Sequence, residues 1–165
     1  MVLFGNLNIL QNSLGFKIKV SYIHIMKISY AVTVSSELDE VKRLIPFLLE
    51  HIQRDDEIVV LWDNKGDSNV YNYLRDTFFL NKITIRHGEF KGHFADWKNH
   101  LNSLCTGDFI FQIDADEIPH ENLIRELPEI IENNPEIEAY VVPRENYVNG
   151  ITQEQMDQAL QNIPD

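Results

Sequence analysis

The sequence has little cysteine, little basic charge and no long apolar run. Its single cysteine, Cys105, excludes internal disulfides and cysteine-based zinc clusters, and it fits a reducing compartment. Lys and Arg number 14 against 26 Asp and Glu, and the formal net charge is −12. This charge argues against nucleic acid or an anionic membrane surface as the main partner. It does not exclude a nucleotide, because a bound metal ion can supply positive charge locally.

Two further absences narrow the class of protein. No apolar run approaches the length of a membrane span, and the N-terminus lacks the order of segments that marks a signal peptide. We therefore expect a cytoplasmic protein without a membrane span. Neither Gly-x-Gly-x-x-Gly nor Gly-x-x-x-x-Gly-Lys occurs, so dinucleotide-dependent dehydrogenases and P-loop enzymes are disfavoured.

The 165 residues fit one domain with a segment added at each end. Residues 1–26 form an N-terminal extension, in which Phe16, Ile18, Val20 and Tyr22 alternate with polar residues as in a strand. An added edge strand, a helix, and sequence upstream of the original start all stay open for this extension. Residues 27–150 form the main domain, and residues 151–165 form a C-terminal tail.

Apolar periodicity predicts strands that alternate with helices from residue 28 onwards. The strands are expected at 28–34, 57–62, 82–86, 109–113 and 139–142. The helices are expected at 38–52, 70–78, 94–104, 119–131 and 153–160. Ser36 and Ser68 are the expected caps of the first two helices, and Pro46 and Pro128 are expected to kink or break theirs. The alternation predicts a single α/β domain with a mainly parallel central sheet flanked by helices.

The fourth predicted strand is followed directly by a cluster of acidic residues. Phe109 to Ile113 is rich in aromatic and β-branched residues, and Asp114, Asp116 and Glu117 follow within four positions. Folding alone does not call for such a cluster, because the charges repel each other and are partly desolvated. Mg²⁺ or Mn²⁺ would relieve both costs and would share its oxygen ligands with substrate phosphates. The plainer alternative is a strand end with solvated carboxylates.

Two other predicted strands also end in polar residues. Thr33 to Ser36 follows the first strand, and Asp63-Asn64 follows the second. In a mainly parallel sheet the carboxyl ends of the strands share one edge, and ligands bind there near a topological switch point. The sequence therefore predicts a metal and diphosphate site at this edge.

Four segments, in this order, resemble the GT-A glycosyltransferases, and those of family 2 most closely. They are Ile28–Val34, Glu57–Asp63, Phe94–Asn99 and Gly107–Glu117. The greatest similarity is to the bacterial lipopolysaccharide-core type, whose members carry a Phe-Ala-x-x-Arg-Asn helix before an Asp-Ala-Asp-Glu strand. Lys98 takes the place of the arginine, which keeps the charge but loses the bidentate fork. The resemblance implies a GT-A (Rossmann-like) nucleotide-sugar-binding domain over residues 27–150.

The resemblance also implies a donor site for a nucleoside-diphosphate sugar. Thr33, Val34 and Ser35 would contact the base and ribose, and Asp63 would hydrogen-bond the base. Uridine is the commonest donor base in this family, so a UDP-sugar is the first expectation.

The metal and phosphate contacts follow from the same resemblance. Asp114 would lie beside the ribose and the metal, and Asp116 would bind the Mn²⁺ or Mg²⁺ ion that bridges the diphosphate. Ala115, between them, belongs to the same donor-binding segment. Lys98 would neutralise phosphate charge, and the further candidates for this are Arg86, Lys91 and His93.

Simpler interpretations stand beside these roles. Asp63 would be a turn former with Asn64 and Gly66. Phe94 and Trp97 share the apolar stripe of a helix and are expected in the core rather than as sugar platforms. Lys98 would lie on a solvated helix face. His87, His93 and His100 lack the spacing of a metal cluster and would be surface or loop residues. Cys105 would be a small, inert hydrophobic residue.

An inverting transferase needs a general base to deprotonate the acceptor hydroxyl. The family supplies this base after the metal motif, where Glu145, Glu154, Asp157 and Asp165 are the carboxylates available. Glu145 and Asp165 are the candidate catalytic residues, and a partner chain is the alternative source of the base. Val142 to Tyr147 resembles the strand that opens the family's acceptor region. Ile163-Pro164-Asp165 resembles the start of a later segment, so residues 151–165 are a tail or a truncated acceptor region.

Three functions stay open at this point. The first is a compact, inverting transferase acting on an unknown glycan, lipid or protein acceptor. The second is a nucleotide-sugar-binding module with little or no transfer activity. The third is a nucleotidyltransferase, which is disfavoured because no glycine-rich, arginine-containing loop follows the first strand. An exposed acceptor side would favour a homodimer.

Overall fold

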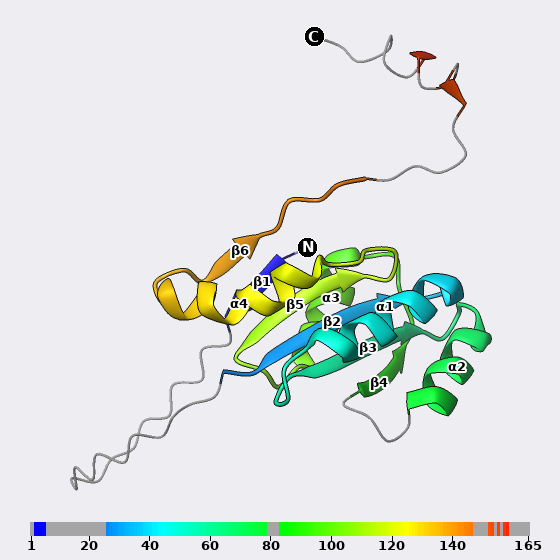
Figure 1. The fold of residues 1–165 in the computed structure, drawn as a ribbon. Helices are drawn as coiled ribbons and strands as arrows, with labels where there is room; N and C mark the ends of the chain where they lie inside the picture. Colours follow the sequence, from blue (N-terminus) through cyan, green and yellow to red (C-terminus); the bar gives the residue numbers. More distant parts are fainter. Residues whose placement is uncertain are drawn as a thin grey trace, which may run out of the picture.

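The computed structural model contains one sheet with the strand order β4-β3-β2-β5-β1-β6 (Figure 1). The structure describes residues 2–5, 26–78 and 83–146, and a few positions between 152 and 158. In these ranges the strands are β1 (Val2–Gly5), β2 (Ile28–Val34), β3 (Glu57–Asp63), β4 (Ile83–Gly88), β5 (Phe109–Asp114) and β6 (Ala139–Val141). The helices are α1 (Leu38–His51), α2 (Ser68–Phe78), α3 (Phe94–Ser103) and α4 (Glu121–Asn133).

The central strands are parallel and buried. β2 pairs in parallel with β3 and β5, and β3 pairs in parallel with β4. β2 and β3 are apolar along nearly their whole length and have almost no solvent contact on either face. Strands with this composition require cover on both faces, because their side chains point alternately to the two sides of the sheet. The parallel centre confirms the predicted α/β fold.

Helices supply that cover on both faces. In Figure 1, α1 and α4 lie in front of the sheet and α3 lies behind it. The front layer is built from apolar residues at helical spacing, among them Leu44 and Leu48 of α1 and Leu127 of α4, all buried against β2, β3 and β5. Behind the sheet, α3 buries Trp97 and Leu101 against a smaller group of strand residues.

The order of the strands creates a switch point between β2 and β5. From β2 the chain proceeds outward through β3 to β4, and it then returns to the other side of β2 to form β5. The connections leaving β2 and β5 therefore diverge at the carboxyl edge of the sheet. A crevice at such a point is where open α/β sheets bind their ligands.

The N-terminal extension contributes a strand inside the sheet rather than at its edge. β1 pairs antiparallel with β5 on one side and with β6 on the other. From the sequence, an added edge strand and a helix were both possible for this extension. Residues 2–5 instead form a strand that lies between β5 and β6. An isolated four-residue strand carries no signal of its partners, because pairing is decided by the rest of the sheet. The predicted alternation at Phe16 to Tyr22 lies outside the described residues.

Some predicted helix boundaries and breaks are wrong. α1 begins at Leu38 with Glu37 at the N-cap position, so Ser36 is not its cap. α2 begins at Ser68, and the Asp67 side chain accepts a hydrogen bond from the Asn69 backbone N–H in the manner of a cap. Pro46 lies inside α1 without ending it. Both Pro46 and Lys42, whose carbonyl loses its helical donor, face solvent, so water can satisfy that carbonyl.

Other boundaries differ by a residue or two. Pro128 lies within α4, which continues to Asn133. β4 extends to Gly88, beyond the predicted end at residue 86, because His87 and Gly88 pair with Trp62 and Asp63 of β3. Such differences are expected where pairing with a neighbouring strand decides the end of an element.

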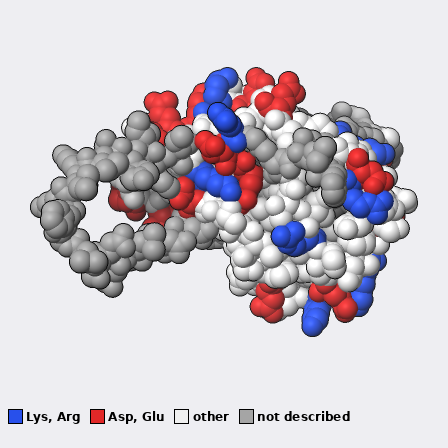
Figure 2. Space-filling view, turned by 90° about the horizontal axis from the view of Figure 1, so that it is seen from below, with Lys and Arg blue, Asp and Glu red and all other residues white. Residues whose placement is uncertain are grey.

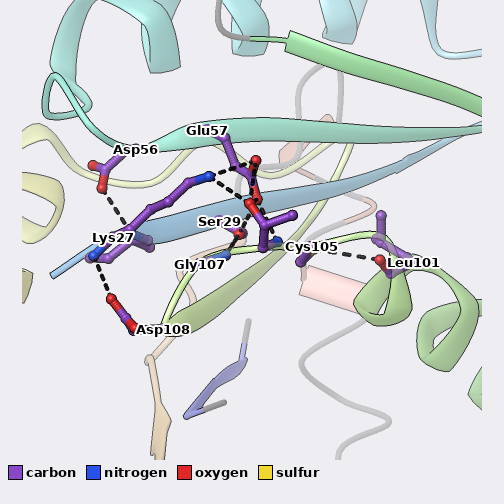
Figure 3. A network of polar contacts seen from close by, with 10 residues as sticks. Lys27, Ser29, Asp56, Glu57, Leu101, Cys105, Gly107 and Asp108 are labelled. Carbon is purple, nitrogen blue, oxygen red and sulfur yellow. Dashed lines mark hydrogen bonds and ion pairs between the residues drawn. The ribbon is translucent and has the colours of Figure 1, made fainter. Parts of the chain in front are cut away.

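A polar network closes the amino edge of the sheet, opposite the switch point (Figure 3). The Glu57 carboxylate, at the start of β3, accepts hydrogen bonds from Ser29 Oγ at 2.6 Å, the Thr106 backbone N–H at 2.6 Å and Lys27 Nζ at 2.9 Å. Ser29 Oγ in turn accepts from the Gly107 backbone N–H at 2.8 Å. The network therefore joins β2, β3 and the turn before β5.

This network makes stability depend on the charge of Glu57. Burial raises the pKa of the Glu57 carboxyl, but the hydrogen bonds from Ser29, Thr106 and Lys27 outweigh burial and lower the pKa. A carboxyl with a lowered pKa stabilises the folded chain above its unfolded pKa of about 4.3. That contribution is lost as the pH falls through the lower, folded pKa.

We therefore expect Glu57→Gln to reduce the free energy of unfolding at pH 7 by about 2 kcal/mol, because a charged hydrogen-bond acceptor is lost. The difference from the wild type should shrink as the pH falls below about 4.3. Urea denaturation across this pH range measures both effects, with the exposed Glu129→Gln as the control. An equal deficit at pH 7 and at pH 3 would contradict the role given to the charge.

Candidate functional site

The carboxyl ends of β2, β3 and β5 surround a pocket of about 330 Å³. The residues predicted for the donor and metal that line it are Thr33, Val34, Ser35, Asp63, Asp114, Ala115 and Asp116. The lining is completed by Glu37, Phe90, Phe94 and Trp97. Three segments that are far apart in the sequence therefore meet at the edge that the strand ends predicted.

Asp114, Thr33 and Lys98 form a hydrogen-bonded cluster between β2, β5 and α3. Thr33 and Asp114 are register partners on adjacent strands, and Thr33 Oγ1 donates to Asp114 Oδ1 at 3.1 Å. Lys98 Nζ donates to the same Asp114 oxygen and also to Thr33 Oγ1, at 3.1 Å in the latter case. The Lys98 side chain is 20% exposed. The alternative that placed Lys98 on a solvated helix face is therefore wrong.

This cluster keeps Asp114 ionised. Burial raises the pKa of its carboxyl, but the hydrogen bond and charge of Lys98, with the hydrogen bond from Thr33, outweigh burial and lower the pKa. Asp114 is consequently a carboxylate at neutral pH, and the Lys98 side chain lies beside it. Both signs of charge are thus present at the switch point.

Asp116 is a pocket carboxylate that has no partner among the described residues. Its side chain is exposed, and it makes no hydrogen bond or ion pair with another described residue. The backbone N–H of Glu117 donates to the Asp114 carbonyl at 2.9 Å, which closes a tight turn around Ala115 and Asp116. This turn fixes the spacing of the two aspartates at the end of β5.

Glu117 holds the same turn with its side chain. One carboxylate oxygen accepts from the Asp114 backbone N–H at 3.1 Å, and the other pairs with the Arg144 guanidinium at 3.2 Å. The Glu117 side chain is only 9% exposed. Sequence reasoning treated Glu117 as a further acid of the cluster, whereas its carboxylate is used to support the turn.

Two carboxylates fit a divalent cation that takes its other ligands from water and substrate. Among the described residues, no group of three or more His, Cys, Asp and Glu side chains gathers in a way that could enclose a metal. Mg²⁺ commonly uses one or two protein carboxylates together with substrate phosphates. The donor set of Asp114 and Asp116 therefore suits a metal held jointly with a diphosphate.

Asp63 shapes the neighbouring loop with one of its oxygens. Asp63 Oδ1 accepts from the Lys65 backbone N–H at 3.1 Å and from the Phe90 backbone N–H at 3.3 Å. The turn-forming alternative for Asp63 is therefore correct as far as these bonds go. Because Asp63 also lines the pocket, the same carboxylate faces any ligand bound there.

The backbone of Ser35 is fixed on several sides. Its N–H donates to a Glu37 carboxylate oxygen at 2.6 Å, and its carbonyl accepts from Trp62 Nε1 at 3.2 Å. Gly66 packs so closely that a Cβ there would lie 2.3 Å from the Ser35 carbonyl oxygen, so no larger residue fits. The sequence did not predict that Glu37 would hold the Ser35 backbone. The position of this glutamate directly after Ser35-Ser36 is only a weak signal of that role.

The prediction that both Phe94 and Trp97 of α3 lie in the core is wrong for Phe94. Trp97 is buried, at 9% exposure, as predicted, but Phe94 is 70% exposed and lines the pocket. Phe94 is the first residue of α3 and lines the pocket at the carboxyl edge, whereas Trp97 packs into the core behind the sheet. Helical periodicity predicts on which side of a helix a side chain lies, but not whether a neighbouring element extends far enough to bury it.

Other predicted residues lie elsewhere. Glu145 follows β6 and does not line this pocket, and Asp165 lies outside the described residues. Arg86 donates to the Ile85 carbonyl. Lys91 and His93 line a second pocket, of about 280 Å³, that shares Trp97 with the first. The structure therefore brings Lys98, but not these three basic side chains, to the carboxylates.

One face of the described surface carries charged side chains of both signs. On the face in Figure 2, the Lys and Arg side chains lie scattered among Asp and Glu and form no continuous basic patch among the described residues. Within those residues, every helix is too short or too polar to cross a membrane.

Comparison with known proteins gives consistent matches. Residues 29–163 match the family model of glycosyl transferase family 2. The chain is 29% identical over 85 residues to glycosyltransferase GlyG of Streptococcus pneumoniae serotype 4 (strain ATCC BAA-334 / TIGR4), a match that covers 50% of this chain and 28% of that protein.

Solved structures of S. aureus TarS have a similar fold. TarS 1-349 in complex with UDP matches with a TM-score of 0.56 and 16% identity, over 67% of this chain and 33% of that one. TarS 1-349 in complex with UDP-GlcNAc matches with a TM-score of 0.53 and 16% identity, over 67% and 32%. At this identity the likeness shows the fold, which is the predicted GT-A fold. The chain spans about a third or less of each of these relatives.

Proposed function

Because the chain belongs to glycosyl transferase family 2, we propose that its carboxyl-edge pocket binds a nucleoside-diphosphate sugar for glycosyl transfer. The observation that carries this proposal is the Asp114–Thr33–Lys98 cluster at the switch point of the sheet, beside Asp116, which has no partner among the described residues. A diphosphate leaving group needs a cation at this position, because negative charge develops as the bond to the sugar breaks.

The residues divide into a phosphate end and a base end. Asp116 would be the main ligand of Mn²⁺ or Mg²⁺, because it has no partner among the described residues to release. Asp114, which is hydrogen-bonded to Thr33 and Lys98, would be the second ligand. Lys98 would share its charge between Asp114 and the diphosphate, as a point charge rather than a bidentate fork. The metal would supply Lewis-acid stabilisation of the leaving group.

The base end consists of Asp63 and the segment Thr33 to Ser35. The Asp63 oxygen that accepts no hydrogen bond from a described residue would accept one from an N–H of the base. The fixed backbone of Ser35 would contact the nucleoside. Uridine is the first base to test, since the TarS structures of similar fold are complexes with UDP and UDP-GlcNAc.

A second candidate function is donor binding without transfer by this chain. Among the described pocket residues, Glu37 is the carboxylate left over for a general base, but it accepts hydrogen bonds from the backbone N–H groups of Ser35 and Ser36. Glu145 and Asp165 stay predictions for the base of an inverting mechanism. The acceptor, whether glycan, lipid or protein, and a homodimer also stay predictions. The third possibility, a nucleotidyltransferase, has no support, because the chain belongs to a family of glycosyl transferases.

Calorimetric titration of the chain with UDP, GDP and UDP-GlcNAc, each with and without Mn²⁺, tests the donor site. We expect UDP to bind more tightly with Mn²⁺ than in EDTA, and more tightly than GDP. If no nucleotide binds even with Mn²⁺, the proposed function is wrong.

A transfer assay separates the two candidate functions. Incubation with UDP-sugars, Mn²⁺ and a panel of acceptors, with release of UDP as the readout, should give transfer if the chain is a complete catalyst. Tight UDP binding without UDP release would favour the binding function.

A further inference from the structure

The pocket has an aromatic wall that the donor and metal residues do not explain. Phe94 stands 70% exposed at the start of α3. The Phe90 and Phe94 ring centroids are 4.9 Å apart, with the rings tilted by 57°. Phe90 meets Trp97 edge to face, at 6.0 Å and 68°. Trp97 is part of the core behind the sheet, so Phe94 is backed by Phe90, and Phe90 by the core.

Phe94 adds little buried apolar surface to this domain, because it is 70% exposed. Its apolar surface stays in contact with water unless a ligand covers it, and covering it would be worth about 25 cal/mol per Å². Single exposed apolar residues are common on protein surfaces and need no special explanation. Phe94 differs because it lines a polar pocket and is supported from behind by a second aromatic ring. Ligand sites combine such an apolar wall with a few placed polar groups.

The position of this wall connects the two ends of the pocket. The Phe90 backbone N–H donates to Asp63 Oδ1 at 3.3 Å, so the wall is joined to the base end. Lys98 lies one helical turn after Phe94 on the same side of α3 and contacts Asp114 and Thr33 at the phosphate end. Phe94, Asp63 and Asp114 thus line the same pocket.

We propose that Phe94, supported by Phe90, is a stacking platform for the nucleobase of the donor. This rests on the proposed function, because it assigns one wall of the same pocket. The base is the part of the donor with a planar π face, and the wall is bonded to Asp63, the side chain that would bind the edge of the base. Stacking tolerates any base, so Phe94 supplies affinity and Asp63 supplies selectivity.

The test compares a ligand that has a base with one that has none. Calorimetry in Mn²⁺ should show that Phe94→Ala binds UDP about 10-fold more weakly than the wild type, the range known for base–aromatic stacking. Phe94→Leu, which keeps apolar bulk without a π face, should lose a similar factor, and Phe94→Trp should stay close to the wild type. Binding of inorganic pyrophosphate should be unchanged in all three variants.

Val141→Ala is the matched control, because Val141 is an apolar side chain on β6 that is 85% exposed and lies outside the pocket. It should bind both ligands as the wild type does. Equal UDP affinity in Phe94→Ala and the wild type would overturn the stacking role and leave the proposed function standing. A parallel loss of pyrophosphate binding would also overturn it, since Phe94 would then support α3 rather than a base. If the wild type binds neither ligand, both proposals fail.

Discussion

Replacing Asp116 by asparagine is expected to weaken Mn²⁺-dependent binding of UDP by about 100-fold, the upper end of the range known for losing residues that merely support metal ligands. Asp116 is exposed and makes no hydrogen bond or ion pair with another described residue. Its carboxylate therefore gives up no protein contact when it binds a cation. Asparagine keeps the shape of the side chain but removes the charge that Mn²⁺ needs.

Calorimetry with Mn²⁺ and with EDTA separates this effect from a general loss of the pocket. In EDTA, Asp116→Asn and the wild type should bind UDP equally, because Asp63, Lys98 and Phe94 are untouched. Asp76→Asn makes the same chemical change at an exposed position on α2 and should have no effect. Undiminished binding by Asp116→Asn in Mn²⁺ would show that the metal ligand has been assigned wrongly.

The second large effect is expected from Glu117→Ala. Its carboxylate accepts from the Asp114 backbone N–H and pairs with Arg144, and the side chain is only 9% exposed. Alanine leaves both donors without their acceptor, which should lower the free energy of unfolding by about 2 kcal/mol. The turn that spaces Asp114 and Asp116 would also loosen, so Mn²⁺-dependent UDP affinity should fall about 10-fold, as for other residues that orient metal ligands.

Two companion variants divide this effect between the contacts of Glu117. Glu117→Gln keeps an oxygen for the Asp114 N–H and loses the ion pair, and Arg144→Ala removes the ion pair from the other side. Both should keep most of the Mn²⁺ effect on UDP binding, measured beside urea denaturation. If Glu117→Ala lost stability but kept the full Mn²⁺ effect, Glu117 would support the fold without positioning the metal ligands.

The sequence carried enough information for the parallel sheet and for the edge at which the site lies. An apolar strand that ends in Asp114-Ala115-Asp116 is a local pattern, and parallel strands must place such ends together. Thr33 and Asp63 followed from the same rule. These predictions needed no knowledge of which side chain contacts which, because strand direction alone determined them.

The contacts of the charged residues could not be obtained in this way. Lys98 is 16 residues from Asp114, and its pairing depends on where α3 crosses the sheet. Glu117 and Arg144 meet because β6 returns to the sheet beside β1. Pairings of this kind are decided by tertiary packing, which a single sequence does not encode in its periodicity.

Short-range periodicity was enough to predict the alternation of strands and helices and the gathering of polar strand ends at one edge. How those ends are used depends on packing between segments that are far apart in the sequence. The tertiary structure paired Asp114 with Lys98, left Asp116 without a partner among the described residues, bonded Glu117 to the turn and left Phe94 exposed at the pocket. It also placed β1 inside the sheet, because the partners of a short strand come from the rest of the fold.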